Sequence, residues 1–163
     1  MNRARVLRRS LRSAPQSGVD GVLIESDQGL ANLLKTVRHV ALVGASHKPE
    51  RPSYQVLTFL LEKGYRVTPV NPGLAGQTLQ GQTVVGALSD IADPVDMVDI
   101  FRQGSALPGL VDETIAIGAP SLWTQLDVRH PEAEQKALDN GLNVVIDKCP
   151  AQEWPRLEAG GLI

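Results

Sequence analysis

Five short apolar runs alternate along the chain with segments whose apolar residues recur at helical spacing. The apolar runs predict strands at residues 40–43, 65–70, 95–101, 121–126 and 143–146. The helical stripes predict helices at residues 27–37, 53–64, 110–118 and 131–140. Strands that alternate with helices in this way form a parallel sheet with right-handed crossovers. The pattern therefore predicts an α/β fold, a five-stranded parallel sheet with helices on both faces.

In three stretches the apolar residues do not recur at a clear helix or strand period. Residues 14–27 predict an irregular segment that packs on the body. Residues 74–90 are rich in glycine and predict a surface excursion with a short helical turn near Leu88. The tail from Pro150 is expected to wrap the edge of the sheet, with Trp154 packed against the body.

The first predicted strand leads into the most informative stretch, HVALVGASHKPERPSYQV at residues 39–56. The strand stops at Gly44, a polar loop follows, and a helix is expected to begin near Pro52 and Ser53. In open α/β sheets this arrangement binds phosphate, because the first N–H groups of the helix are free to donate to an anion. An ordinary strand-to-helix turn has the same pattern, so the stretch alone leaves both interpretations open.

Composition and charge narrow the class of protein. The arginines among residues 1–13 account for five of the 16 basic residues, so the rest of the chain has 18 acidic residues against 11 basic ones. A body that acidic is a poor general binder of nucleic acid. No apolar run approaches the roughly 20 residues of a membrane span. The single cysteine, Cys149, excludes an internal disulfide, disfavours a zinc cluster and favours a cytoplasmic location.

The arginine-rich start predicts an N-terminal extension over residues 1–27, partly disordered, before a single domain over residues 28–163. A targeting segment would give the same composition, although the apolar core of a secretory signal is missing. A wrongly assigned start codon would give it too.

Basic residues gather in the loops after the predicted strands, where open α/β sheets bind their ligands. They are Lys48, Arg51, Arg102, Arg129 and Lys148. They favour an anionic ligand, although surface loops also carry charge for solubility alone.

The common nucleotide fingerprints are absent. After Gly44 the chain has Ser46 and Pro49 where G-x-G-x-x-G needs its later glycines. Asn71 and Pro72 follow the second strand, where an NAD site needs an acid for the ribose hydroxyls. The sequence also contains no G-x-x-x-x-G-K-[ST] loop. NAD and ATP are therefore disfavoured as ligands.

Five segments at predicted strand ends carry a family resemblance. They are GASHKPERPSYQV at 44–56, PVNP at 69–72, DMVDIFR at 96–102, LWTQL at 122–126 and VVIDKCP at 144–150. Together they resemble the CoA-binding domain family, the small stand-alone relative of the N-terminal domain of the succinyl-CoA synthetase α subunit, over about residues 36–154. The resemblance implies a Rossmann-like fold that binds coenzyme A or an acyl-CoA at the carboxyl ends of the strands.

The family pattern also implies roles for individual residues. The residues expected at the CoA phosphates are Gly44, Ala45 and Ser46 through their backbone, and then Lys48, Arg51, Pro52, Ser53 and Tyr54. Those expected along the rest of the ligand are Asn71 and Pro72 at the adenosine, Phe101 and Arg102 along the cleft, and Gln125 near the pantetheine. A simple turn residue is an equal alternative for Asn71. Met97 and Trp123 are expected in the core.

The chain departs from the family at Asp127, where a glycine usually follows LWTQL. A carboxylate at this position would repel a phosphate-bearing ligand. The loss of glycine would also strain a tight turn.

No catalytic set emerges from the remaining polar residues. His39 is expected to be structural, His47 to contact ligand or solvent, and His130 to start a helix. Asp96 and Asp99 share a strand, so one of them is expected to be buried and hydrogen-bonded. Related ligases keep their phosphorylated histidine in a second domain, for which this chain is too short. Cys149 could form a mixed disulfide with the CoA thiol, or simply pack as a small residue.

Two functions therefore remain open. The first is a CoA or acyl-CoA binding protein without catalysis of its own. The second is an oxidoreductase or transferase that uses NAD(P) or another nucleotide at the same strand ends. The absent acid and the absent catalytic set favour the first. The sequence leaves any protein partner open, and a monomer or weak homo-oligomer is expected.

Overall fold

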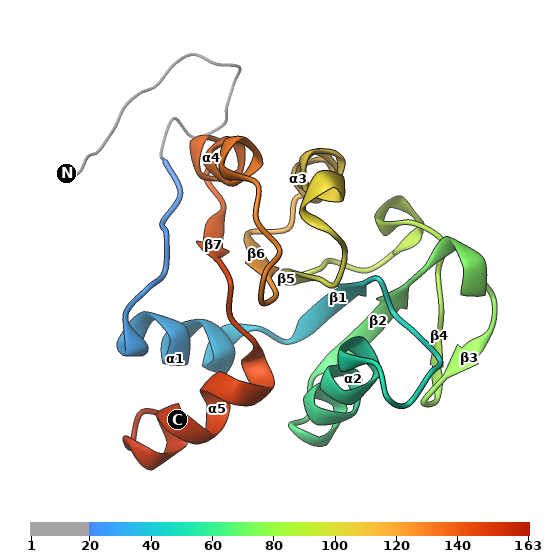
Figure 1. Cartoon of the computed structure of the whole chain (residues 1–163), viewed down its shortest axis with the longest axis horizontal. Helices are drawn as coiled ribbons and strands as arrows, with labels where there is room; N and C mark the ends of the chain where they lie inside the picture. The colour runs from blue at the N-terminus through green and yellow to red at the C-terminus, as the bar shows by residue number, and fades with distance from the viewer. Residues whose placement is uncertain (1–19) are drawn as a thin grey trace.

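A computed structural model describes residues 20–163, and its centre is a five-stranded parallel sheet (Figure 1). The strands are β1 (His39–Val43), β2 (Arg66–Val70), β5 (Met97–Ile100), β6 (Ser121–Thr124) and β7 (Asn143–Val145). They lie in the order β2-β1-β5-β6-β7, and every neighbouring pair is parallel. The predicted Rossmann-like α/β sheet is confirmed.

Helices cover both faces of this sheet. In the described part of the chain they are α1 (Asp27–Thr36), α2 (Pro52–Glu62), α3 (Leu107–Ala116), α4 (Pro131–Asp139) and α5 (Pro150–Ala159). Figure 1 shows α1, α2 and α5 on one face and α3 and α4 on the other. Three short 3-10 helices complete the chain, η1 (Pro72–Leu74), η2 (Leu88–Asp90) and η3 (Gly104–Ala106).

The tail from Pro150, expected only to wrap the edge of the sheet, forms helix α5 over Pro150–Ala159. Proline suits the first helical position, because its missing N–H has no intrahelical partner there. Pro155 inside the helix and the weak apolar period concealed it. Packing compensates, since the Trp154 ring lies edge-on to Phe59 and Tyr65 at centroid distances of 5.9 and 6.3 Å. The predicted packing of Trp154 against the body is confirmed.

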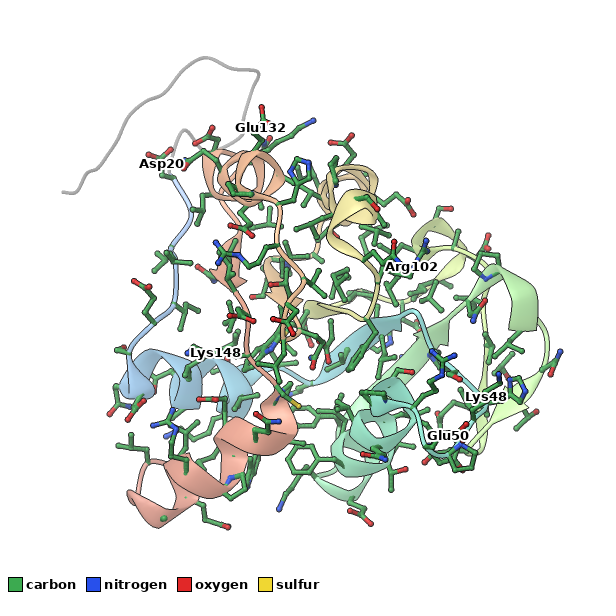
Figure 2. The ribbon with its side chains drawn as sticks, viewed as in Figure 1. Asp20, Lys48, Glu50, Arg102, Glu132 and Lys148 are labelled. Carbon is green, nitrogen blue, oxygen red and sulfur yellow. The ribbon has the colours of Figure 1, made fainter. Side chains whose placement is uncertain are left out.

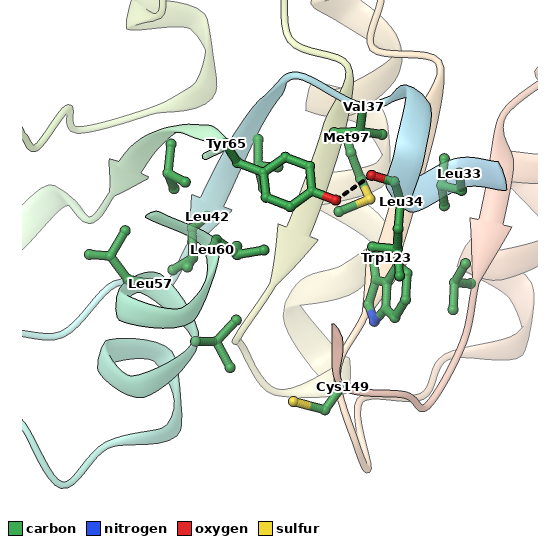
Figure 3. Close-up of a cluster of buried hydrophobic side chains, with 14 of the residues drawn as sticks. Leu33, Leu34, Val37, Leu42, Leu57, Leu60, Tyr65, Met97, Trp123 and Cys149 are labelled. Carbon is green, nitrogen blue, oxygen red and sulfur yellow. Dashed lines mark hydrogen bonds between the residues drawn. The ribbon is translucent and has the colours of Figure 1, made fainter. Parts of the chain in front are cut away.

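The core on the α1, α2 and α5 face contains Leu42, Met97 and Trp123 (Figure 3). Met97 and Trp123 are 1% and 0% exposed, which confirms their prediction as core. In the same cluster the Tyr65 hydroxyl donates to the Leu34 carbonyl, and burial raises the pKa of Tyr65 to about 12. This layer fixes α2 and α5, whose N-termini reach the carboxyl ends of the strands.

The segment at residues 20–26 packs on the body, as predicted for residues 14–27 in the part that the structure describes. Leu23 pairs with Val144, which covers the outer edge of β7. Residues 1–19 lie outside the described residues. The predicted excursion at 74–90 contains a hairpin of β3 (Thr78–Leu79) and β4 (Gln82–Thr83), with η2 at the expected helical turn. No helix within residues 20–163 is long and apolar enough to cross a membrane.

The amino ends of the strands are held by buried polar groups. His39 is 5% exposed, and its ring nitrogens lie 2.7 Å from the Pro94 carbonyl oxygen and 2.7 Å from Thr68 Oγ1. Asp96 Oδ2 accepts hydrogen bonds from the backbone N–H groups of Arg38 and His39. The predicted structural role of His39 is confirmed.

Candidate functional site

The candidate site lies where the strand order reverses, between β1 and β5. From β1 the chain crosses to β2 on one side, and from β5 it continues to β6 and β7 on the other. In open α/β sheets this switch point leaves a crevice at the carboxyl ends of the strands, and ligands bind there. Gly44 follows β1 and Phe101 follows β5, so these two residues form the base of the crevice.

Gly44 is required by the close approach of the two strand ends. Its φ is +90°, and a Cβ at this position would lie 2.4 Å from the Phe101 carbonyl oxygen. The N–H groups of Gly44 and Ala45 both donate to the Val70 carbonyl, at 3.0 and 3.2 Å. Because these two donors are already engaged, the N–H groups of Gly44 and Ala45 are not free to donate to a ligand; Ser46 lines the main cleft.

Two clefts open at this end of the sheet. The main cleft has a volume of about 680 Å³. Its walls are Gly44, Ser46, Arg51, Pro52, Ser53, Gln55, Val56, Phe101, Arg102, Gln103, Gln125, Leu126, Val128, Cys149, Ala151 and Gln152. The smaller cleft has a volume of about 340 Å³. Its walls are Val43, Gly44, Val70, Asn71, Pro72, Gly86, Ala87, Leu88, Arg102, Leu110 and Glu113.

Gly44 and Arg102 line both clefts, so the two form adjoining parts of one groove. The Arg102 side chain is exposed beside the carboxyl end of β1 (Figure 2). Both clefts fall within the range of about 300–1,000 Å³ that is usual for small-molecule sites. An elongated ligand could therefore occupy both and pass Arg102 at the junction.

The structure brings ten of the thirteen predicted site residues to the groove. Those in the main cleft are Gly44, Ser46, Arg51, Pro52, Ser53, Phe101, Arg102 and Gln125, and the smaller cleft adds Asn71 and Pro72. Ala45, Lys48 and Tyr54 line neither cleft. Ala45 is buried and Tyr54 packs against the core cluster. Lys48 is exposed on the loop near Glu50, away from Arg102 in Figure 2.

Arg51 caps α2 with extended backbone, and its side chain is exposed at the main cleft. It forms no ion pair within residues 20–163. Arg129, by contrast, is bound to Glu134, with Nε 3.0 Å from Oε2, and it does not line the groove. Arg51 and Arg102 are therefore the two predicted cations that line it.

Asn71 ties the end of β2 to the loop after β1. Its Oδ1 accepts from the Gly73 N–H at 2.8 Å, and its Nδ2 donates to the Ala45 carbonyl at 2.7 Å. The turn interpretation of Asn71 is thus confirmed, and the side chain also shapes the smaller cleft.

A buried polar pair lies beneath the main cleft. Gln125 is 6% exposed, and its Nε2 donates to Asp99 Oδ1 at 2.5 Å. Asp99 is fully buried, and its Oδ2 has no hydrogen-bond partner. Burial raises the pKa of Asp99 to about 7, although the bond from Gln125 lowers it. The expectation of a buried, hydrogen-bonded aspartate in this strand is confirmed.

The helix that follows Cys149 is the part of the site that sequence reasoning missed, whereas Cys149 itself was expected near the ligand. Cys149 is the N-cap of α5, is 8% exposed, and lines the main cleft together with Ala151 and Gln152. Burial raises the pKa of Cys149, and the charge of Asp99 adds to the effect. The signal that could have revealed this helix is Pro150, directly after a predicted strand.

Asp127 has a φ of +67°, which confirms that the position needs the left-handed conformation for which glycine is suited. Its N–H donates to Asp147 Oδ1 at 2.7 Å. Asp127 does not line either cleft, so its carboxylate is not placed to repel a ligand there. His130 caps α4, as expected, because its Nδ1 accepts from the Ala133 N–H at 3.2 Å.

The sequence profile of the CoA binding domain matches residues 38–155, a span that contains every strand of the sheet and both clefts. The chain belongs to this family. The resemblance carried by the five strand-end motifs is therefore confirmed.

Individual relatives agree with this assignment. An uncharacterised Bacillus subtilis protein, YneT, is 32% identical over 120 residues, which are 74% of this chain and 87% of YneT. A Thermus thermophilus protein of known structure is 40% identical, with a TM-score of 0.79 over 82% of this chain and 99% of that one.

Part of a larger enzyme is also similar. A dinucleotide-forming acetyl-coenzyme A synthetase from Candidatus Korarchaeum cryptofilum is 25% identical with a TM-score of 0.56. The match covers 65% of this chain but only 25% of the synthetase, so the matched part of this chain corresponds to a quarter of that enzyme.

Proposed function

We propose that this chain binds coenzyme A or an acyl-CoA in the groove at the switch point, and that binding rather than catalytic turnover is its function. The observation that carries the proposal is the pair of adjoining clefts with Arg102 and Gly44 at their junction. CoA is elongated, with a nucleotide at one end, a diphosphate near the middle and a thiol-bearing pantetheine arm at the other. A two-part groove with Arg102 at its junction and Arg51 in the main cleft matches that shape and charge.

The charged part of CoA belongs near the junction. Arg102 is exposed at the junction and Arg51 at the main cleft, and a guanidinium can donate two parallel hydrogen bonds to one phosphate. Ser46 and Ser53 line the same wall, and Ser53 lies in the first turn of α2. The positive end of the α2 dipole therefore faces the position that we propose for the diphosphate.

The residues that line each cleft suggest where the two ends of the ligand lie. The smaller cleft, between Asn71 and Leu88, would hold the adenosine. The pantetheine arm would occupy the main cleft, where Phe101 and Val128 offer apolar contact and Gln125 offers an amide. Its thiol end would lie toward the start of α5. The membership of the CoA binding domain family supports this arrangement.

Isothermal titration with CoA and with NAD tests the proposal. We expect heat of binding with CoA and none with NAD, because Asn71 caps η1 where an NAD site would place an acid. Comparable affinity for NAD, or no heat with CoA at about millimolar concentration (the weak end of specific binding), would contradict it.

The variant Arg51→Ala tests the placement of the phosphates. Loss of a charge-assisted hydrogen bond costs about 1.5–3 kcal/mol, so CoA affinity should fall about ten- to a hundredfold. Arg38→Ala is the matched control, because Arg38 is also exposed but precedes β1 at the opposite end of the sheet. Equal affinities in the two variants would show that Arg51 does not contact the ligand.

A further inference from the structure

The wall of the main cleft contains an exposed leucine, Leu126. It is 47% exposed. The other large apolar side chains that are exposed within residues 20–163 are Val22 and Leu23, which lie on the segment before α1 and line neither cleft. An isolated exposed apolar side chain is common on a protein surface. Leu126 differs because it lies in a cleft, where a bound ligand can cover it.

The fold does not itself require a leucine at position 126. The Val128 N–H donates to the Gln125 carbonyl at 3.1 Å, so Leu126 and Asp127 are the two central residues of a turn. Glycine, proline and short polar residues dominate such positions, because they suit the backbone of a turn and lie in water without cost. The leucine side chain therefore indicates an apolar contact that the chain alone does not supply.

The turn that carries Leu126 is anchored on both sides. The Asp127 N–H donates to Asp147 Oδ1 at 2.7 Å, which ties the turn to the end of β7. Glu134 is 5% exposed and accepts two hydrogen bonds from the Arg129 guanidinium, at 3.0 and 3.2 Å, which ties the following residues to α4. A ligand that covers Leu126 would meet a turn that is already in place, so it would not have to order the turn on binding.

The other walls of the main cleft suit an uncharged group beside Leu126. Phe101 and Ala151 are half-buried and line the same cleft. Within residues 20–163 the charged side chains that line it are Arg51 and Arg102, where we place the diphosphate. A carboxylate at the far end of the ligand would therefore lose water without gaining a cation of its own. An apolar group at that end would meet no such cost.

We propose that the preferred ligand of this groove is an acyl-CoA with an uncharged aliphatic acyl group, and that this group packs on Leu126. The inference rests on the proposed CoA-binding function and specifies the class of CoA derivative. In that arrangement the thiol end of CoA lies toward the start of α5, and the turn of Leu126 is tied to the end of β7, the strand that leads into α5. Free CoA would leave the leucine in water, whereas an aliphatic chain on the sulfur would cover it.

Titration calorimetry of the full chain with CoA, butyryl-CoA and succinyl-CoA tests the proposal. Butyryl-CoA should bind about tenfold more tightly than CoA, because burial of about two methylene groups has this effect. Succinyl-CoA has an acyl chain of the same carbon number that ends in a carboxylate, and it should bind no more tightly than CoA. Leu126→Asn should bind CoA like the wild type and lose the preference for butyryl-CoA. Val22→Asn, which changes an exposed apolar residue outside both clefts, should keep the preference.

The same titrations separate this inference from the proposed function. If CoA and butyryl-CoA bind with equal affinity, the acyl contact is refuted and the CoA-binding function stands. If neither binds, both proposals fail. An unchanged preference for butyryl-CoA in Leu126→Asn would refute the role of Leu126. Tighter binding of succinyl-CoA than of butyryl-CoA would refute the uncharged acyl group.

Discussion

Replacing Gly44 by alanine tests how closely the ends of β1 and β5 approach each other. An alanine in the left-handed region costs about 1–2 kcal/mol, and the φ of Gly44 is +90°. The added Cβ would also lie 2.4 Å from the Phe101 carbonyl oxygen. Inserting an atom into filled space typically costs about 1–3 kcal/mol more. Gly44→Ala should therefore lower the free energy of unfolding by about 2–5 kcal/mol.

Gly64→Ala provides the matched control. Gly64 has the same φ of +90°, but nothing lies within 4 Å of the position that a Cβ would take there. This variant should lose only the backbone contribution of about 1–2 kcal/mol. Equilibrium urea unfolding, followed by circular dichroism, measures both losses. Equal losses would refute the reasoning, because contact with Phe101 would then contribute nothing to the requirement for glycine at position 44.

Three other changes separate stability from binding. Burial holds the pKa of Asp99 at about 7 against an ordinary value of 3.8, so the folded state binds this proton more tightly and stability falls as pH rises between these values. Urea unfolding should give a lower free energy of unfolding at about pH 8 than at about pH 5, and the loss over the whole range between the two pKa values is at most about 4 kcal/mol. Asp99→Asn should lack this loss, and parallel pH profiles of the two proteins would contradict the reasoning. His39→Ala should lose about 1–3 kcal/mol of stability while its CoA affinity stays unchanged, because the hydrogen bonds of His39 lie at the amino end of β1. Weaker CoA binding in the folded variant would contradict the placement of the ligand at the opposite end of the sheet. Asp127→Gly should change the affinity for CoA by less than about threefold relative to the wild type, which is less than about 1 kcal/mol of binding free energy. A larger gain in affinity would show that the carboxylate does reach the ligand.

The sheet could be predicted because its strands are short, apolar and separated by helical stripes. All five residues of β1 are buried, as expected for a central parallel strand covered on both faces. Helix α5 could not be predicted in the same way. Its interior proline opposes a helix, and contacts of Trp154 with Phe59 and Tyr65, far away in the sequence, compensate.

The site could be predicted only where one segment determines it. Gly44, Arg51 and Ser53 lie on a single strand, loop and helix start, and all three reach the main cleft. Lys48 and Tyr54 lie on the same segment, but sequence proximity does not give the direction of a side chain, and neither lines a cleft. The bond between Asp99 and Gln125 joins residues 26 positions apart, and only the pairing of β5 with β6 brings them together.

Amide chemical shifts recorded while CoA is titrated into the protein test most directly whether this groove is the CoA site. We predict saturable shifts at Gly44, Ser46, Ser53, Arg102 and Gln125, which line the groove. Arg38 and Tyr65, at the opposite end of the sheet, should be unaffected. Shifts confined to that opposite end, or no shifts at about millimolar CoA, the weak end of specific binding, would contradict the assignment.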